Sequence, residues 1–388
     1  MKKKILIVAH HLTVGGVQKS LISALKALDY DKYDVTLYLR KNRNELLSFI
    51  DNRVRVVFNE DSHHYYRKPY AVLLQIKEIL YRCLKSKEKA EAAKAELAEK
   101  IVNDSMNYEC RTYFDSVHYD VAIAYVQGYT AQFVAEHISA DKKIVFFHTS
   151  TDDHHEIHER ILPEFDTVVA LHDEQRKLIE GWYPIISDRI KIVANYTDEM
   201  FVKEQSGAYE VYKKAELCLC SCGRLATVKG FDMAVKAAEI LNNSRLDFVW
   251  YFVGDGPERD ALEMMISDKG LGDKVIITGM QKNPYPYMAA CDIYVQPSYE
   301  ESWGLTIAEA QQLKKPAIST ATVGGKKLVD NGKTGVLCEI NAEAIARAIV
   351  DLANNKSMTK TIIENLEIRD NLSELNSFRA QWENVLEG

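Results

Sequence analysis

The feature that most constrains the fold is an alternation of short β-rich apolar runs with amphipathic segments, which occurs twice along the 388 residues. Apolar strands that alternate with helical segments are typical of a parallel sheet covered on both faces. The first series of expected strands comprises 5–8, 35–39, 54–58, 121–125, 144–147, 168–170 and 190–193. The second series, which follows a polar stretch at 197–214, comprises 217–221, 248–253, 275–278, 293–295 and 317–319.

Helical periodicity fills the spaces between the later strands, at 232–241, 258–266, 306–313 and 342–352. A chain of this length exceeds what one hydrophobic core usually organises. The sequence therefore predicts an α/β protein with a first domain at 1–197 and a second at 198–371. A last helix at 372–388 is expected to pack back on the first domain and complete it.

Composition excludes several classes of protein. The formal net charge of -7 disfavours a dedicated nucleic-acid binder, which needs a basic face to displace counterions. No apolar run approaches the roughly 18 residues that span a bilayer. The seven cysteines include no CxxC pair, and Cys218, Cys220 and Cys222 alternate as buried strand residues would, so a reducing, cytoplasmic location is expected. We interpret Ile5 to Ala9 as a first strand rather than a signal peptide, because His10 and His11 end the run early.

A segment at about 64–110 departs from the alternation and is expected to be a helical insertion in the first domain. An apolar stripe within 65–87 is flanked by basic residues, namely Arg67, Lys68, Lys77, Arg82, Lys85 and Lys87. One interpretation is a helix that faces the core and has a solvated basic back. The other is a peripheral contact with the inner face of a membrane.

The strongest chemical signal is a pair of glutamates, Glu301 and Glu309, that bracket the expected start of a helix. Between them the sequence reads Ser302, Trp303, Gly304, Leu305, Thr306, Ile307 and Ala308. Gly304 permits a close backbone approach, and the free N–H groups of the next helical turn favour an anion such as a phosphate. Carboxylates on either side of that phosphate are suited to bind the hydroxyls of a sugar and a ribose. Taken singly, Glu301 is also an ordinary loop acid and Glu309 an ordinary exposed helix residue.

The second signal is a pair of cations at the end of the first strand of the second domain. Gly223 and Arg224 follow that strand, and Lys229 precedes the next helix. Ligands of doubly wound sheets bind at this edge, and two cations can neutralise a diphosphate leaving group without a metal ion. Gly254, which ends another strand of the same domain, is expected to line this site.

Signals in the first domain are weaker. Gly15 and Gly16 stand between the first strand and the first helix, but without the GxGxxG fingerprint and without an acid after the second strand, which disfavours a dehydrogenase. His148 ends a strand and is expected to reach the cleft. The cluster of His154, His155 and His158 has helical spacing without supporting carboxylates, so no metal site is expected.

Together these motifs resemble glycosyltransferase family 4, whose members are retaining enzymes with the GT-B fold. The glutamate, seven residues, glutamate pattern matches 301–309, and the Gly-Arg-Leu with a later Lys-Gly matches 223–225 and 229–230. The resemblance implies two Rossmann-like, doubly wound domains that face a central cleft. It also implies roles: Arg224 and Lys229 would bind the diphosphate, Glu301 the donor sugar and Glu309 the ribose. Further donor or acceptor contacts would come from Met280, near the base, and from Gly15, Gly16 and His148.

The function implied is transfer of a hexose-type sugar from a nucleotide diphosphate sugar, with UDP-sugars favoured, to a glycan or lipid-linked acceptor of the cell envelope. No metal or other cofactor is expected. Trp303 stands where the family usually has phenylalanine, which leaves the choice of donor open. A nucleotide-sugar epimerase and a non-catalytic partner subunit on the same scaffold are the alternatives.

Overall fold

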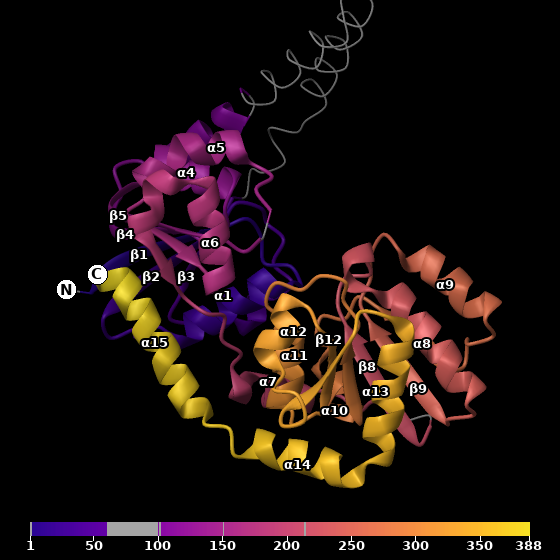
Figure 1. Ribbon diagram of the computed structural model, residues 1–388. Helices are drawn as coiled ribbons and strands as arrows, with labels where there is room; N and C mark the ends of the chain where they lie inside the picture. The colour runs from indigo at the N-terminus through magenta and orange to yellow at the C-terminus, as the bar shows by residue number, and fades with distance from the viewer. Residues whose placement is uncertain (1, 60–99, 101, 150, 213–214) are drawn as a thin grey trace, which may run out of the picture. The chain divides into compact units, whose positions relative to one another are not determined.

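The computed structural model describes residues 2–59, 100, 102–149, 151–212 and 215–388 (Figure 1). These residues form two compact units: unit 1 comprises Met1–Ala194 with Phe378–Gly388, and unit 2 comprises Asn195–Ser377. Most of the expected insertion at 64–110, and all of the basic segment at 65–87, lies outside the described residues. None of the helices in the described part is both long and apolar enough to cross a membrane.

Unit 1 is built on a seven-stranded parallel sheet in the order β3-β2-β1-β4-β5-β6-β7. Its strands are β1 (Lys3–Ala9), β2 (Tyr33–Leu39), β3 (Arg55–Phe58), β4 (His118–Ala124), β5 (Ser139–Phe146), β6 (Thr167–Ala170) and β7 (Ile190–Ile192). Its helices are α1 (Gly16–Ala27), α4 (Tyr129–His137), α5 (His155–Ile161), α6 (Asp173–Trp182) and the last part of α15 (Asn371–Glu387), with further helix at 102–113.

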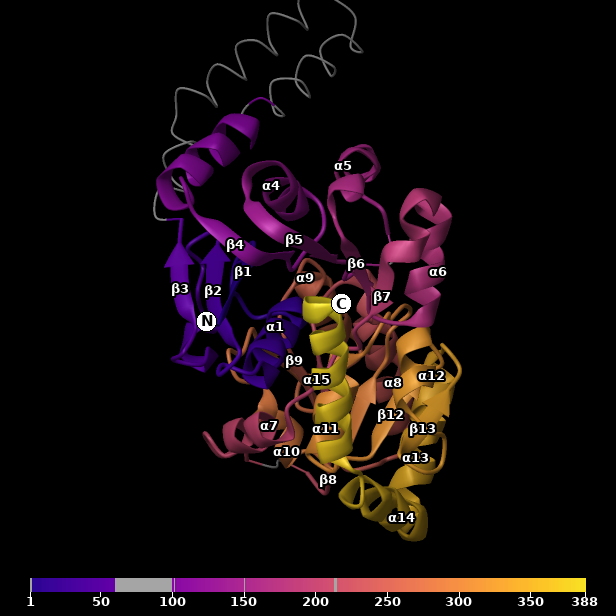
Figure 2. The ribbon, with the colours of Figure 1, turned by 90° about the vertical axis from the view of Figure 1, so that its left-hand side faces the viewer.

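Helices cover both faces of this sheet (Figures 1 and 2). On one face, residues of α4, α5 and α6 join a buried cluster with β4 and β5. On the other face, Trp382 of α15 stacks on Phe146 of β5 with ring centroids 5.1 Å apart. The central strands are buried on both sides, which is why they form uninterrupted apolar runs in the sequence.

Unit 2 repeats this plan with six parallel strands in the order β10-β9-β8-β11-β12-β13. The strands are β8 (Leu217–Cys222), β9 (Phe248–Val253), β10 (Val275–Gly279), β11 (Ile293–Gln296), β12 (Ala317–Thr320) and β13 (Gly335–Cys338). The helices are α7 (Glu199–Ser206), α8 (Phe231–Asn243), α9 (Arg259–Asp268), α10 (Tyr285–Ala290), α11 (Leu305–Gln312), α12 (Val323–Leu328), α13 (Ala342–Asn354) and α14 (Lys356–Glu367).

Strand β13, at the edge of this sheet, is not among the strands expected from the sequence. Its four residues are only partly buried after the first, so the segment lacks the apolar run that marks the inner strands. The alternating cysteines of β8, by contrast, are buried as expected. Figure 1 shows α8, α9 and α13 on one face of the sheet and α10, α11 and α12 on the other.

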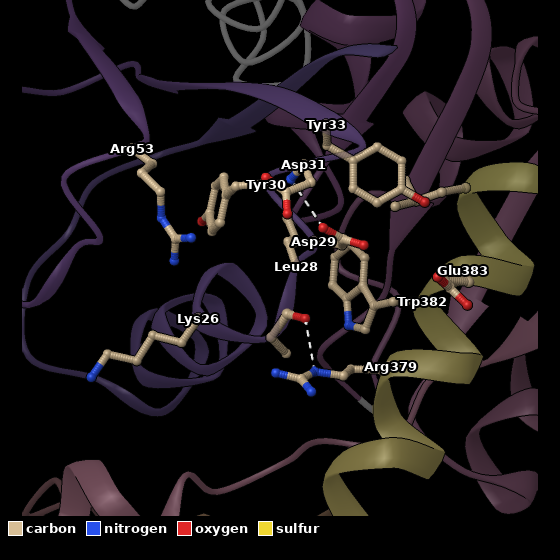
Figure 3. Close-up of a pocket in the computed structure, with 12 residues that line it drawn as sticks. Lys26, Leu28, Asp29, Tyr30, Asp31, Tyr33, Arg53, Arg379, Trp382 and Glu383 are labelled. Atoms are coloured by element: carbon tan, nitrogen blue, oxygen red, sulfur yellow. Dashed lines mark hydrogen bonds between the residues drawn. The ribbon is translucent and has the colours of Figure 1, made fainter. Parts of the chain in front are cut away.

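A cavity of about 360 Å³ opens in unit 1 between the end of α1 and α15 (Figure 3). Arg379, Trp382 and Glu383 of α15 face Leu28 and the turn that leads into β2. This turn precedes β2, so the cavity lies at the amino end of the sheet. None of the site residues expected from the sequence lines it.

Candidate functional site

The topological switch point of unit 2 lies beside β8, the strand that pairs with β9 on one side and β11 on the other. The chain passes from β8 to β9 and β10 on one side and then crosses back to β11 on the other side, so the loops that follow β8 and β11 border the crevice of the switch point. The first loop carries Arg224 and Lys229, and the second carries Glu301. Both expected signals of the second domain therefore lie at the position where doubly wound sheets bind ligands.

Lys229 and Glu301 form an ion pair across this switch point. The Lys229 Nζ lies 2.7 Å from the Glu301 Oε2, and the two side chains are 27% and 13% exposed. Gly230 brings the two loops together: its φ is +66°, and a Cβ there would lie 2.0 Å from the carbonyl oxygen of Pro297. Lys229 and Glu301 are 72 residues apart in the sequence. They are brought together by a close contact between the two loop backbones that only glycine permits.

Helix α11 begins beside this pair with an uncapped N-terminus. Gly304 occupies the N-cap with a φ of +88°, and no side chain caps the first turn. The first N–H groups of a helix have no acceptor within the helix and carry partial positive charge, so they are suited to bind a phosphate. Ser302 and Leu305 are half-buried around this turn, whereas the Thr306 hydroxyl donates to the Gln296 Oε1 at 2.9 Å.

Glu309 is 2% exposed, so the interpretation of this residue as an ordinary exposed helix position is wrong. The hydroxyl of Tyr285, at the start of α10, donates to its Oε1 at 3.0 Å. Burial and the neighbouring Glu309 carboxylate raise the pKa of Tyr285 well above its usual value, which keeps the hydroxyl protonated as a donor. A buried carboxylate that is held by a fixed donor is preorganised to accept further hydrogen bonds.

The remaining expected residues of unit 2 surround the same edge. Gly254 follows β9, and a Cβ there would lie 1.8 Å from the carbonyl oxygen of Gly223. Arg224 is exposed, and Met280, after β10, is 54% exposed. Trp303 is buried beneath the Lys327 ammonium, which lies 4.1 Å from the ring centroid.

Sequence reasoning missed Gln296, the last residue of β11. Its amide oxygen accepts from the hydroxyls of Tyr294 and Thr306, and its Nε2 donates to the Ser298 hydroxyl at 2.9 Å and approaches the Glu301 Oε2 at 3.4 Å. Gln296 thus ties β11, the following loop and α11 together. Its position at the carboxyl end of a strand was the available signal, but one buried amide in an apolar strand does not reveal its partners.

Unit 1 has its own switch point, between β1 and β4. Gly15 is the N-cap of α1 and Gly16 is its first residue, so both lie in the loop after β1, and the Glu45 carboxylate accepts from the Val14 N–H at 3.2 Å. In the same loop, burial lowers the pKa of His10 to about 4, and the nearby Lys41 adds to this effect.

His148 follows β5 on the same edge of the unit 1 sheet. Its Nε2 is buried and has no partner among the described residues. The ring forms a hydrogen bond to the backbone of Tyr125, and this bond favours the protonated form of His148. The ring therefore donates an N–H in this bond. Because Nε2 has no partner among the described residues, we assign the N–H to Nδ1. Burial nevertheless lowers the pKa of His148 to about 4. The ring is therefore neutral, and Nε2 offers a lone pair that can accept a hydrogen bond.

Two histidines of the cluster after β5 donate hydrogen bonds to Asp152. The Asp152 carboxylate accepts from the His155 Nδ1 at 2.6 Å and from the His158 Nδ1 at 2.7 Å, and Tyr183 also donates to it. His154 packs against Gly128. Across the described ranges, no group of three or more histidine, cysteine or acidic side chains has the arrangement of a metal site.

The two sheets, each doubly wound and covered by helices, define the GT-B fold. Solved structures agree with this assignment. The crystal structure of Anabaena Alr3699/HepE in complex with UDP and glucose matches 99% of each chain with a TM-score of 0.68 at 18% identity. Sucrose-phosphate synthase (tll1590) from Thermosynechococcus elongatus matches 99% of this chain and 98% of its own with a TM-score of 0.72 at 17% identity.

The family model that matches this chain covers a large part of unit 2. Residues 203–369 match the family model described as glycosyl transferases group 1. The lipopolysaccharide core biosynthesis glycosyltransferase LpsE of Rhizobium meliloti (strain 1021) is 29% identical over 193 residues, 47% of this chain and 52% of that protein. The alpha-D-kanosaminyltransferase of Streptomyces kanamyceticus is 31% identical over 146 residues, 37% and 38% of the two chains. The aligned part spans about half the length of these relatives or less.

Proposed function

We propose that the protein is a retaining, metal-independent glycosyltransferase of family 4. It would move a hexose-type sugar from a nucleotide diphosphate sugar to a glycan or lipid-linked acceptor, with UDP-sugars as the favoured donors. The observation that carries the proposal is the Lys229–Glu301 ion pair beside the uncapped start of α11 at the switch point of unit 2. A cation, an acid and an anion-binding helix start meet there within two loops.

In this proposal the diphosphate binds at the N-terminus of α11, with Arg224 and Lys229 as its cationic partners. These cations stabilise the negative charge that develops on the leaving nucleoside diphosphate, a role that other enzymes give to a metal ion. Lys229 exchanges its bond to Glu301 for one to the phosphate. The released Glu301 carboxylate then accepts hydrogen bonds from the hydroxyls of the donor sugar.

The nucleoside would extend along the same edge toward Glu309, which we assign to the ribose hydroxyls, and toward Met280, Gly223 and Gly254 near the base and phosphates. Buried carboxylates form strong charge-assisted hydrogen bonds with hydroxyl donors. Ser302, Trp303, Leu305 and Thr306 complete the phosphate and sugar side. In unit 1 we assign donor or acceptor contacts to Gly15, Gly16 and His148.

The proposed acceptor and place of action follow from a relative and from the composition of one segment. The relative LpsE is named for lipopolysaccharide core biosynthesis, which favours a role in the cell envelope. A cytoplasmic enzyme with a peripheral membrane contact through 65–87 agrees with the basic character of that segment, which lies outside the described residues.

A thermal-shift screen of UDP-, GDP- and ADP-sugars tests donor binding directly. We expect a UDP-sugar to raise the melting temperature of the wild type and to have a much smaller effect on Glu309→Ala. Release of nucleotide from that donor is then measured with and without an extract of acceptor glycans and lipids. Release that depends on acceptor supports transfer, whereas conversion of the donor sugar without acceptor would identify an epimerase. Absence of any shift with all donors would overturn the proposal in favour of a non-catalytic subunit.

A further inference from the structure

A buried histidine holds a backbone N–H group at the switch point of unit 1. The His158 side chain is 1% exposed, and its Nε2 accepts from the Gly128 N–H at 2.9 Å. Gly128 follows β4, the strand next to β1, and is the N-cap of α4. The contact joins residues 30 positions apart, so it belongs to the tertiary structure of this edge.

The protonation state of His158 follows from its two partners. A backbone N–H can only donate, so the Nε2 that accepts from Gly128 carries no proton. The proton of the neutral ring is then on Nδ1, which donates to the Asp152 Oδ1 at 2.7 Å. Asp152 therefore selects the tautomer that leaves Nε2 free to accept.

Gly128 cannot be replaced without moving this edge. Its φ is +74°, and a Cβ there would lie 2.5 Å from the Cδ2 of His154. The preceding residue, Gln127, turns its side chain toward the end of β5, where its Oε1 accepts from the His148 N–H at 3.2 Å and its Nε2 donates to the Thr149 hydroxyl at 2.6 Å. The backbone at Gly128 thus determines where the Gln127 side chain begins.

We propose that Asp152 and His158 are positioning residues for His148, acting through the Gly128 backbone and the Gln127 side chain. The chain of contacts runs from Asp152 to His158, to Gly128 and, through the adjacent Gln127, to the His148 backbone. The role of His148 as a substrate contact rests on the proposed function, whereas the chain of contacts does not.

Two substitutions at one position separate positioning from packing. His158→Gln places an amide oxygen near the position of Nε2 and can still accept from Gly128. His158→Asn places its amide near Nδ1, keeps a partner for Asp152 and leaves the Gly128 N–H without an acceptor. We expect His158→Gln to keep kcat within about threefold of wild type, and His158→Asn to lower kcat about tenfold with the donor KM little changed.

A double-mutant cycle with His148→Ala tests whether the effect passes through His148. If it does, His158→Asn lowers kcat about tenfold in the wild type but less than about twofold when His148 is already absent. Equal losses in both backgrounds would overturn the proposal, as would equal losses in His158→Gln and His158→Asn. Thermal melting of both variants controls for general destabilisation.

A second measurement keeps the inference independent of activity. The ring signal of His148 in a ¹H–¹³C NMR spectrum, assigned by comparison with His148→Ala, is expected to shift in His158→Asn and to stay near its wild-type position in His158→Gln. An unchanged signal in both variants would refute positioning even in an active enzyme. A selective shift in a chain that transfers no sugar would support positioning and count against the proposed function alone.

Discussion

The two switch points of this protein are built from different kinds of interaction. In unit 2, the groups come from two short segments, 223–230 and 297–309, and they meet as a charged pair beside a helix start. In unit 1, the corresponding groups come from the segments after β4 and β5, where the neutral side chains of His158 and Gln127 accept from backbone N–H groups. One edge is organised by charge and the other by hydrogen-bond geometry.

This difference separates two ways in which substitutions should act. The Lys229–Glu301 ion pair is partly open to solvent, with side chains 27% and 13% exposed, so in the proposed function Lys229 can exchange its partner for a charged ligand. A buried neutral network depends on every donor and acceptor, because one orphaned group costs about 1–3 kcal/mol. Substitutions in unit 2 should therefore affect activity more than stability, and substitutions in unit 1 should affect geometry and pH dependence.

The largest effect on stability is expected at Gly254. This residue lies in unit 2, but its substitution should affect stability more than activity. A Cβ at this position would lie 1.8 Å from the Gly223 carbonyl oxygen, on a backbone with a φ of +155°. Overpacking and backbone strain together lead us to expect that Gly254→Ala lowers the free energy of unfolding by about 3 kcal/mol. Urea denaturation measures this loss. Gly272→Ala is the matched control, since a Cβ there meets nothing within 4 Å, and equal stability of the two variants would refute the close approach.

Removal of the cation from the unit 2 pair should affect activity most strongly. We expect Lys229→Ala to lower kcat/KM for the donor about 10- to 100-fold, because the proposed charge-assisted bond to the leaving phosphate would be lost. Steady-state assays of nucleotide release provide the measurement. Lys236→Ala removes an exposed i,i+4 partner of Asp232 on α8 and should leave the rate unchanged. Similar rates for Lys229→Ala and wild type would mean that the pair is only structural.

The most recognisable local motif of the sequence lies in unit 2, for a physical reason. Gly304 and the flanking Glu301 and Glu309 are close together in the chain, so they form a pattern that is visible without the fold. The rhythm of apolar runs likewise predicted most strands of both sheets, because strands buried on both faces must be apolar. The partly buried β13 lacks that signature, and it was missed.

The side-chain contacts of unit 1 could not be predicted from a local sequence motif. Gln127, His158 and Asp152 meet through tertiary packing, and each is a common residue type with no local pattern around it. Nor did the sequence reveal that Glu309 would be buried against Tyr285. Side-chain partners across a sheet edge depend on backbone positions within about an ångström, which periodicity does not encode.

The neutral network of unit 1 should become visible in the pH dependence of stability. Burial lowers the pKa of His148 to about 4 from an ordinary 6.5, so between these values the unfolded chain binds a proton that the folded chain does not. Stability should therefore rise with pH, and about 2 kcal/mol should be lost between pH 7.5 and pH 5.

Urea unfolding of wild type and His148→Phe at several pH values measures this contribution. The phenylalanine keeps a ring beside Tyr125 and removes the titrating group, so the loss on acidification should be smaller by about the same 2 kcal/mol. His118→Phe replaces a histidine whose side chain is 55% exposed and should leave the loss as in wild type. If the free energy of unfolding falls equally on acidification in wild type and His148→Phe, then His148 is not held neutral by burial.

The smallest effect concerns Glu309, the buried acid of the unit 2 motif, which accepts a hydrogen bond from the Tyr285 hydroxyl. Tyr285→Phe removes the hydroxyl that donates to Glu309 at 3.0 Å without opening a cavity. Loss of that bond should raise the donor KM about fivefold while kcat changes little, since the proposed ribose contact would be made equally in the ground and transition states. Tyr287→Phe, two residues along the same helix, is the control. A fall in kcat with an unchanged KM would instead place Glu309 among the groups that stabilise the transition state, and the charge-based account of unit 2 would then extend to its buried acid.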